Sequence, residues 1–181
     1  VKLFSPVILG IIGGHFQKDI FIQQLRVGIP LGIASGLILV GLERVFIPYL
    51  PEAFLEKASE ISLSPLTRFL YGGITEEVMV RWGIMSLLVF TLWKAFNRRN
   101  EVVKPIFYWI AIIGAALFFG MGHLPIAMSL AGEAVNNVLI TYIIVANSIF
   151  GIVAGWLFWK YGLEAAIVSH IFAHVVMIIL A

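Results

Sequence analysis

Two adjacent carboxylates and an arginine lie within an otherwise apolar stretch of the sequence. The stretch reads GGITEEVMVR, and its charged residues are Glu76, Glu77 and Arg81; the other residues from 71 to 93 are uncharged. At the centre of a membrane helix each such charge costs roughly 2.5–3.5 kcal/mol. The sequence therefore predicts that these charges are paired, face a wet cavity or serve a chemical function.

The spacing of the three charges indicates different roles for the two carboxylates. Glu77 precedes Arg81 by four residues, which is the favourable order for an ion pair on one helix face. Glu76 is rotated by about 100° from Glu77 on a helix, so it points elsewhere and is free to act as a general base. The alternative is that the Glu–Arg pair is only a structural salt bridge between helices.

Three histidines lie on or at the end of other apolar runs. His123 ends one run, and His170 and His174 are four residues apart on the last one. Helical zinc sites use that spacing to direct two imidazoles at one ion. The alternatives are an interfacial His123 and a histidine pair that only packs between helices. Convergence of Glu76 with these histidines is typical of a site that activates water inside a membrane.

The composition predicts the class of protein that holds these residues. Hydrophobic residues make up 61% of the 181 positions and charged residues 12%, whereas soluble domains average about 25% charged. The mean hydropathy is +1.02. We therefore expect an all-α polytopic integral membrane protein, with five to six transmembrane helices around an intramembrane polar cavity. The few basic residues lie between apolar runs, which indicates no nucleic-acid partner, and the absence of Cys excludes disulfides.

The apolar runs predict the individual elements of a single domain, residues 1–181, whose core motifs lie within 66–181. The expected spans are residues 27–46, 66–93, 105–122, 134–159 and 163–181. We expect a short non-spanning piece at 3–14, a loop and helix entry at 15–26, an extramembrane segment with a short surface helix at 48–64, a basic turn at 97–104, a loop at 124–133 and a tight turn at 160–162. Small residues predict close helix approach at Gly28, Gly32, Ser35 and Gly36, and bulky aromatics are expected to face lipid or the interface at Phe118, Phe119, Trp156 and Trp159.

Charge bias predicts the orientation in the membrane. The connections on one side carry most of the basic residues, namely Lys18, Arg26, Lys94, Arg98, Arg99, Lys104 and Lys160. The positive-inside rule makes that side cytoplasmic, which puts the charged cluster in the outer half of the bilayer. The small size and bare loops indicate the inner (plasma) membrane of a prokaryotic cell.

The polar residues resemble the motifs of the CPBP family, the CAAX protease and bacteriocin-processing intramembrane proteases, also called type II CAAX prenyl endopeptidases. The first motif is similar to Glu76-Glu77-x-x-x-Arg81, the second to Phe119-x-x-x-His123, and the third to His170-x-x-x-His174. The three occur in family order over residues 76–174. The family usually has Asn or Asp where this chain has His174. By this resemblance, Glu77 and Arg81 form a supporting ion pair.

The resemblance implies an endopeptidase that cleaves a membrane-associated protein or peptide within or beside the lipid bilayer. By that similarity, Glu76 and His123 would activate the attacking water, and His170 and the residue at position 174 would polarise the scissile carbonyl. A neutral His174 can donate a hydrogen bond to an oxyanion as Asn does. The sequence does not indicate an oligomeric state.

Two alternatives remain open at the level of the sequence. A divalent metal such as zinc could be held by Glu76, His123 and His170. His174 would then either be a further ligand or contact the ligands without binding the metal. A non-enzymatic membrane protein, either a proton-coupled transporter or a bacteriocin-immunity scaffold, could use the same buried residues. Transporters usually carry internal repeats, and this sequence shows none.

Overall fold

The computed structural model describes residues 3–61, 63–96 and 102–180. Within these ranges the chain forms helices and short connections without a β-strand. Five helices of the described chain are long and apolar enough to cross a membrane: Lys18–Tyr49, Pro65–Phe96, Pro105–Ala134, Asn137–Tyr161 and Leu163–Leu180. The prediction of an all-α polytopic membrane protein is confirmed, with the lower of the two expected span counts.

The first span begins earlier than the sequence predicted. Helix α2 (Lys18–Phe46) already includes most of residues 15–26, which were expected to be a loop and helix entry. The helix can begin this early because Gln24, a polar residue of this stretch, has partners inside the protein. Gln24 is only 1% exposed, and its side-chain amide donates to the Tyr161 carbonyl at 2.7 Å and to Glu164 at 3.0 Å. A polar stretch whose groups are paired can continue a membrane helix.

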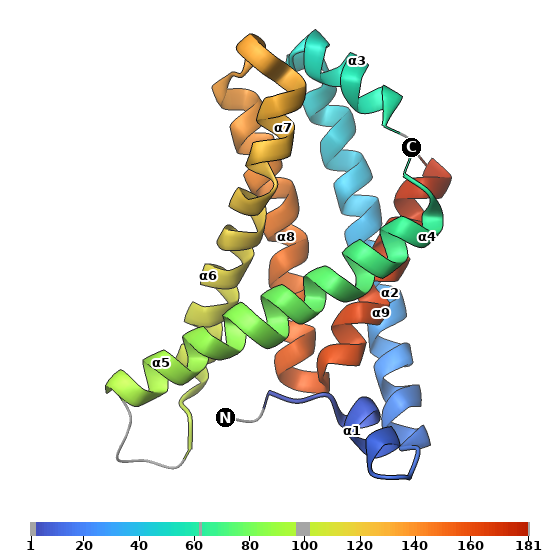
Figure 1. Ribbon diagram of the computed structural model, residues 1–181, viewed down its shortest axis with the longest axis vertical. Helices are drawn as coiled ribbons and strands as arrows, with labels where there is room; N and C mark the ends of the chain where they lie inside the picture. Colours follow the sequence, from blue (N-terminus) through green and yellow to red (C-terminus); the bar gives the residue numbers. More distant parts are fainter. Residues whose placement is uncertain (1–2, 62, 97–101, 181) are drawn as a thin grey trace.

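The prediction of a loop at residues 124–133 is wrong. Helix α7 (Leu124–Ala131) occupies most of that range, with Pro125 in its first turn. Proline is tolerated there because that position has no backbone hydrogen bond to lose. Together with the 3-10 turn η1 (Ile47–Tyr49), the predicted surface helix α3 (Glu52–Glu60) and the 3-10 turn η4 (Gly132–Ala134), α7 caps one end of the molecule (Figure 1). Phe54 of α3 packs in one apolar cluster with Ala127 and Ala131 of α7.

The helix that carries the charged stretch is continuous from residue 65 to residue 96. It consists of α4 (Pro65–Thr67), η2 (Arg68–Glu76), η3 (Val78–Met85) and α5 (Ser86–Phe96). Ser64 caps its start by accepting the Thr67 amide at 3.1 Å. Segments η2 and η3 are wound as π-helix, a form that is rare elsewhere and frequent at functional sites.

The remaining spans lie close to their predicted positions. They are α6 (Pro105–Gly122), α8 (Asn137–Tyr161) and α9 (Leu163–Leu180). Asn136 caps α8 by accepting the Leu139 amide at 2.8 Å. The chain then reverses into α9 at Gly162, whose φ of +100° suits glycine. Most of the basic turn predicted at 97–104 lies outside the described residues.

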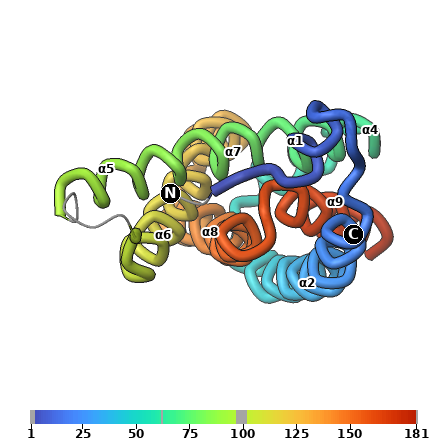
Figure 2. Tube along the Cα trace, turned by 90° about the horizontal axis from the view of Figure 1, so that it is seen from below, coloured from blue at the N-terminus to red at the C-terminus, as the bar shows by residue number. Residues whose placement is uncertain are grey.

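The spans form a row that the charged helix crosses. Contacts link α2 to α9, α9 to α8 and α8 to α6. The helix from α4 to α5 runs obliquely across this row and touches α9 at one end and α6 at the other (Figures 1 and 2). Because of that diagonal course, side chains near its middle can face residues from both α6 and α9.

Glycines bring α2 into direct backbone contact with α9, as the small residues predicted. A Cβ atom on Gly28 would lie 2.9 Å from the Ala165 carbonyl oxygen, and one on Gly32 would collide with the Ser169 carbonyl. Gly36 continues the same stripe one turn later. Close approach of this kind is the usual source of helix association in lipid. It sets the position of the helix that carries His170.

The short N-terminal helix α1 (Pro6–Ile12) is attached to α9 through an acidic side chain. One carboxylate oxygen of Glu164 accepts the Ser5 hydroxyl at 2.6 Å and the backbone amides of Val7 and Ile8 at 3.0 and 2.9 Å. These amides have no partner within the helix. Glu164 therefore has a structural contact that explains its place in an apolar span.

We predict that Gly32→Ala destabilises the protein by about 1–3 kcal/mol, because the added methyl group must push α9 away from α2. Thermal unfolding in detergent measures the effect. Gly41→Ala is the matched control on the same helix, since a Cβ there would meet nothing within 4 Å. Equal stability of the two variants would contradict the packing argument.

Candidate functional site

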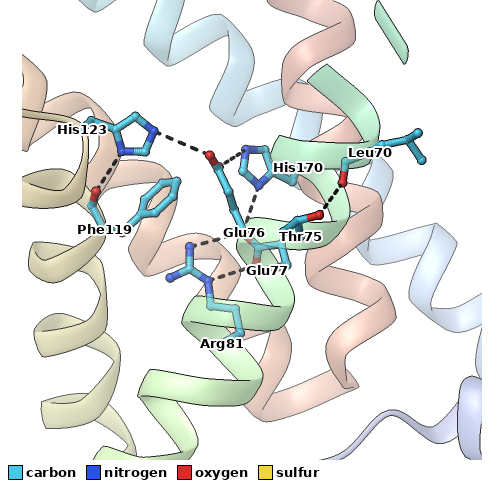
Figure 3. A network of polar contacts seen from close by, with 8 residues as sticks. All are labelled: Leu70, Thr75, Glu76, Glu77, Arg81, Phe119, His123 and His170. Carbon is cyan, nitrogen blue, oxygen red and sulfur yellow. Dashed lines mark hydrogen bonds and ion pairs between the residues drawn. The ribbon is translucent and has the colours of Figure 1, made fainter. Parts of the chain in front are cut away.

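Glu76 faces histidines from two other helices. One carboxylate oxygen lies 3.9 Å from Nε2 of His123, at the end of α6, and the other lies 3.9 Å from Nε2 of His170 on α9 (Figure 3). Both separations exceed a direct hydrogen bond and leave room for a bridging atom or water. The structure thus brings together three residues that are far apart in the sequence.

The backbone of α6 decides the tautomer of His123. Nδ1 of His123 lies 2.9 Å from the carbonyl oxygen of Phe119. A carbonyl only accepts, so Nδ1 carries the proton and donates it. In the neutral ring Nε2 is then unprotonated, and this is the nitrogen that faces Glu76. The Phe119 ring also packs edge-on against His123 at 4.7 Å between centroids.

A carboxylate decides the tautomer of His170 in the same way. Nδ1 of His170 donates to Glu77 across 2.9 Å, so the neutral ring presents an unprotonated Nε2 to Glu76. Glu77 in turn accepts Nε–H of Arg81 at 3.0 Å. Arg81, Glu77 and His170 thus form a chain of contacts that orients the imidazole, in the manner of a carboxylate behind a functional histidine.

The two carboxylates have different environments. The side chains of Glu77 and Arg81 are completely buried, whereas Glu76 is 16% exposed and His123 is 32% exposed. The Arg81 guanidinium also lies 5.2 Å from the centroid of the Phe119 ring, within cation–π range. Glu77 is therefore held as part of the framework, and Glu76 is the carboxylate that a substrate or water can reach.

His174 lies behind His170 on the same face of α9. The two rings stack at 4.8 Å between centroids, with an interplanar angle of 14°. Gly72 makes room for the ring, because a Cβ at that position would collide with Nε2 of His174. Nδ1 of His174 is buried and has no hydrogen-bond partner among the described residues.

All four predicted catalytic residues line one cavity of about 650 Å³. That volume lies within the range of small-molecule and peptide-side-chain pockets. The lining includes Glu76, His123, His170 and His174, with Phe119 and Phe150 beside them. The cavity reaches these side chains and has room for the water that ionised carboxylates in a membrane require.

The donor types around Glu76 suit zinc, since two unprotonated imidazole nitrogens and a carboxylate are common zinc ligands. Among residues 3–61, 63–96 and 102–180, however, no three His, Cys, Asp or Glu side chains are arranged so that they could hold an ion as they stand. The metal set Glu76, His123 and His170 stays a prediction, and no catalytic step is derived through it.

Comparison with protein families identifies the class of enzyme. A family model described as type II CAAX prenyl endopeptidase Rce1-like matches residues 59–176, which is well over half of the chain and includes Glu76, Glu77, Arg81 and the three histidines of the site. The chain belongs to this family. The protein is therefore a peptidase. This finding confirms the resemblance and does not support the alternatives of a transporter or an immunity scaffold. No match was found among curated proteins or solved structures.

The sequence misplaced one aromatic residue of the endopeptidase and did not single out another. Phe119 was expected to face lipid or the interface, but it is only 6% exposed, because its ring lies among Arg81 and the two histidines. Phe150 of α8 packs against His170 at 4.2 Å between ring centroids. Its position in a long uncharged span gave no signal, because an aromatic residue there is equally suited to lipid.

We predict that Arg81→Met destabilises the endopeptidase by about 3–5 kcal/mol, because it leaves the Glu77 carboxylate buried without a counter-charge. Peptide cleavage should fall as well, since His170 loses its fixed support. Thermal unfolding and an activity assay measure the two effects. The double variant Glu77→Gln/Arg81→Met is the control and should recover part of the stability; a single variant as stable as the original protein would refute the argument.

Proposed function

We propose that the protein hydrolyses peptide bonds of membrane-associated substrates with a water molecule activated by Glu76. The observation that supports this most directly is the position of the Glu76 carboxylate. It lies in the cavity at 3.9 Å from Nε2 of each of two imidazole rings. In both rings the other nitrogen, Nδ1, is already hydrogen-bonded. A water in this gap would contact a base and a hydrogen-bond acceptor at once.

In the proposed reaction, Glu76 takes a proton from the water as its oxygen attacks the scissile carbonyl carbon. Nε2 of His123 accepts a hydrogen bond from the second O–H of that water, which keeps its hydrogen, and so orients it. The proton held by Glu76 then passes to the nitrogen of the leaving peptide as the C–N bond breaks. General acid–base catalysis by one positioned group contributes typically 10²–10⁴-fold.

The negative charge that develops on the carbonyl oxygen needs donors, and we assign this role to His170 and His174. His170 can donate from Nε2 only when its ring is protonated. Glu77 supports that state at Nδ1, as the buried carboxylate of a catalytic triad does. His174, stacked on His170, can supply a second N–H from a neutral ring. Preorganised donors of this kind are usually the largest single term in catalysis.

We further propose that the protein resides in a prokaryotic inner membrane with the capped end outside. The basic residues Lys18, Lys104 and Lys160 lie at the ends of their helices away from α3 and α7. The positive-inside rule then places α3, α7 and the cavity toward the outer face. The substrate would enter from the bilayer or its outer surface.

We predict that Glu76→Gln and His123→Ala each lower the rate of cleavage of a membrane-tethered peptide by about 10²-fold or more. Both residues are partly exposed in the cavity, so the melting temperature should change little. Glu60→Gln on the surface helix α3 is the control and should retain activity. Full activity in either site variant would remove that residue from the mechanism.

We predict that cleavage survives complete removal of divalent metal, because the proposed reaction activates water with Glu76 and has no step through a metal. The measurement is activity after chelation, with the residual metal content determined by mass spectrometry. A loss of activity that one equivalent of zinc restores would instead assign Glu76, His123 and His170 as ligands.

A further inference from the structure

Aromatic side chains gather at the end of the molecule away from α3 and α7. Four of the five tryptophans lie there, on the last two turns of α5 and α8 or the first two turns of α6: Trp93, Trp109, Trp156 and Trp159. The start of α6 and the end of α8 are neighbours at this end (Figures 1 and 2). Tryptophan is enriched where membrane helices pass the lipid headgroups, which places this part of α6 and α8 at headgroup level.

Trp159 is the centre of a cluster of rings between α6 and α8. Its ring stacks on Tyr108 at 4.7 Å between centroids, with an interplanar angle of 11°, and meets Trp109 edge-on at 6.0 Å. Tyr108 is only 6% exposed, so the cluster is anchored in the interface between the two helices. Ring contacts of this kind have preferred geometries, and they fix the plane of the partly buried Trp159 ring.

The ammonium group of Lys160 lies over this ring cluster. Its Nζ is 3.7 Å from the centroid of the Trp159 ring, within the range of a cation–π contact. The lysine is exposed, so the ring holds its charge at the surface of the protein. An ammonium group has three N–H donors, and a contact with one ring leaves donors for a partner outside the protein.

Carboxylates of the protein do not neutralise this charge. In the chain that the structure describes, neither Lys160 nor Lys104 forms an ion pair. Lys104 immediately precedes α6 and is four residues before Tyr108, about one helical turn from the ring cluster. Glu164, which is close to Lys160 in the sequence, contacts α1 and Gln24 instead. The two lysines are therefore available to an external anion.

An exposed apolar line leads from the ring cluster along the helices. On α8 it consists of Val145, Ile152 and Trp159, which are seven residues apart and so lie close to one face of the helix. On α6, Trp109 and Ile113 are 39% and 49% exposed. The residues from 145 to 159 rise about 21 Å, which is more than half of the roughly 30 Å hydrocarbon thickness. The line is therefore long enough for the acyl chains of one leaflet.

We propose that this surface binds an anionic phospholipid of the adjacent leaflet. The headgroup phosphate contacts Lys160, with Lys104 as a second cation, and the acyl chains lie along α8 and α6. A phospholipid is favoured over a soluble anion because the exposed cation and the apolar line meet at the Trp159 ring, so that one molecule can contact both. None of these residues lines the cavity that holds Glu76, so the proposal does not depend on the proposed function.

The test uses phospholipids with brominated acyl chains, which quench the fluorescence of tryptophans that they contact. The protein is placed in phosphatidylcholine bilayers in which part of the lipid is brominated phosphatidylglycerol or brominated phosphatidylcholine. A lysine near the headgroups contributes about fivefold in affinity for an anionic lipid. We therefore expect phosphatidylglycerol to bind about 5- to 25-fold more tightly than phosphatidylcholine, and Lys160→Gln to lower this preference about fivefold.

Two further variants separate a defined site from general surface charge. Lys160→Arg keeps the cation and should retain most of the preference. Lys18→Gln is the matched control, because Lys18 is an exposed lysine at the same end of the molecule, on α2 at the far end of the row from α6. It should retain the full preference. Each variant changes an exposed side chain, so the melting temperatures in pure phosphatidylcholine should equal that of the original protein.

Equal quenching by the two brominated lipids would overturn the proposal. An equal loss of preference in Lys160→Gln and Lys18→Gln would also overturn it, because the lipid would then respond only to the overall charge of this end. Competition by inorganic phosphate would reassign the lysines to a soluble anion and refute the lipid site. A loss that is confined to Lys160→Gln and absent from Lys160→Arg supports the site, whether or not the protein cleaves peptides.

Discussion

Glu77 and Arg81 are both inaccessible to solvent, and their 3.0 Å contact neutralises two charges that the interior of a bilayer would otherwise exclude. The pair does more than cancel charge. Glu77 also accepts a hydrogen bond from Nδ1 of His170 at 2.9 Å. Arg81 lies over the ring of Phe119, and the backbone carbonyl of Phe119 accepts a hydrogen bond from His123. One buried ion pair thus connects the orientation of both imidazoles that face Glu76.

The site depends equally on how closely the helices approach. Gly32 allows α2 to press on α9 at Ser169, next to His170, and Gly72 leaves room for the His174 ring. In lipid there is no hydrophobic force to bring helices together, so small residues and polar contacts provide the association. Interactions remote from the proposed reacting centre therefore set distances within it, and an error of about 1 Å in such a centre can cost 100-fold in rate.

The cavity combines two regions with different electrostatic character. Around Glu76 the positive and negative groups are matched, and the carboxylate is exposed enough to meet water. Near the start of the oblique helix the same cavity is lined by Arg68, Glu43 and Tyr142.

Much of the fold could be predicted because the bilayer restricts the choices. A spanning segment must be an apolar helix of sufficient length, so the composition and the uncharged runs led to the correct class and to spans near their observed positions. The helix entry expected within 15–26 comes near the start of that range, and the loop predicted at 124–133 is a helix, for a common reason. Their polar residues or proline suggested an interruption, but the side-chain NH2 group of Gln24 donates to partners on α8 and α9, and Pro125 falls in a first helical turn.

The sequence by itself identified the candidate site residues, because Glu76, Glu77, Arg81 and the three histidines are too costly in lipid to be there without a partner or a function. It also determined the Glu77–Arg81 spacing, which is local to one helix. Only the tertiary structure decided the protonated nitrogen of His170, the burial of Phe119 and the extent of the cavity toward Arg68. These depend on the oblique crossing of one helix over α9 and α6, and contacts between distant segments leave no periodic trace along the chain.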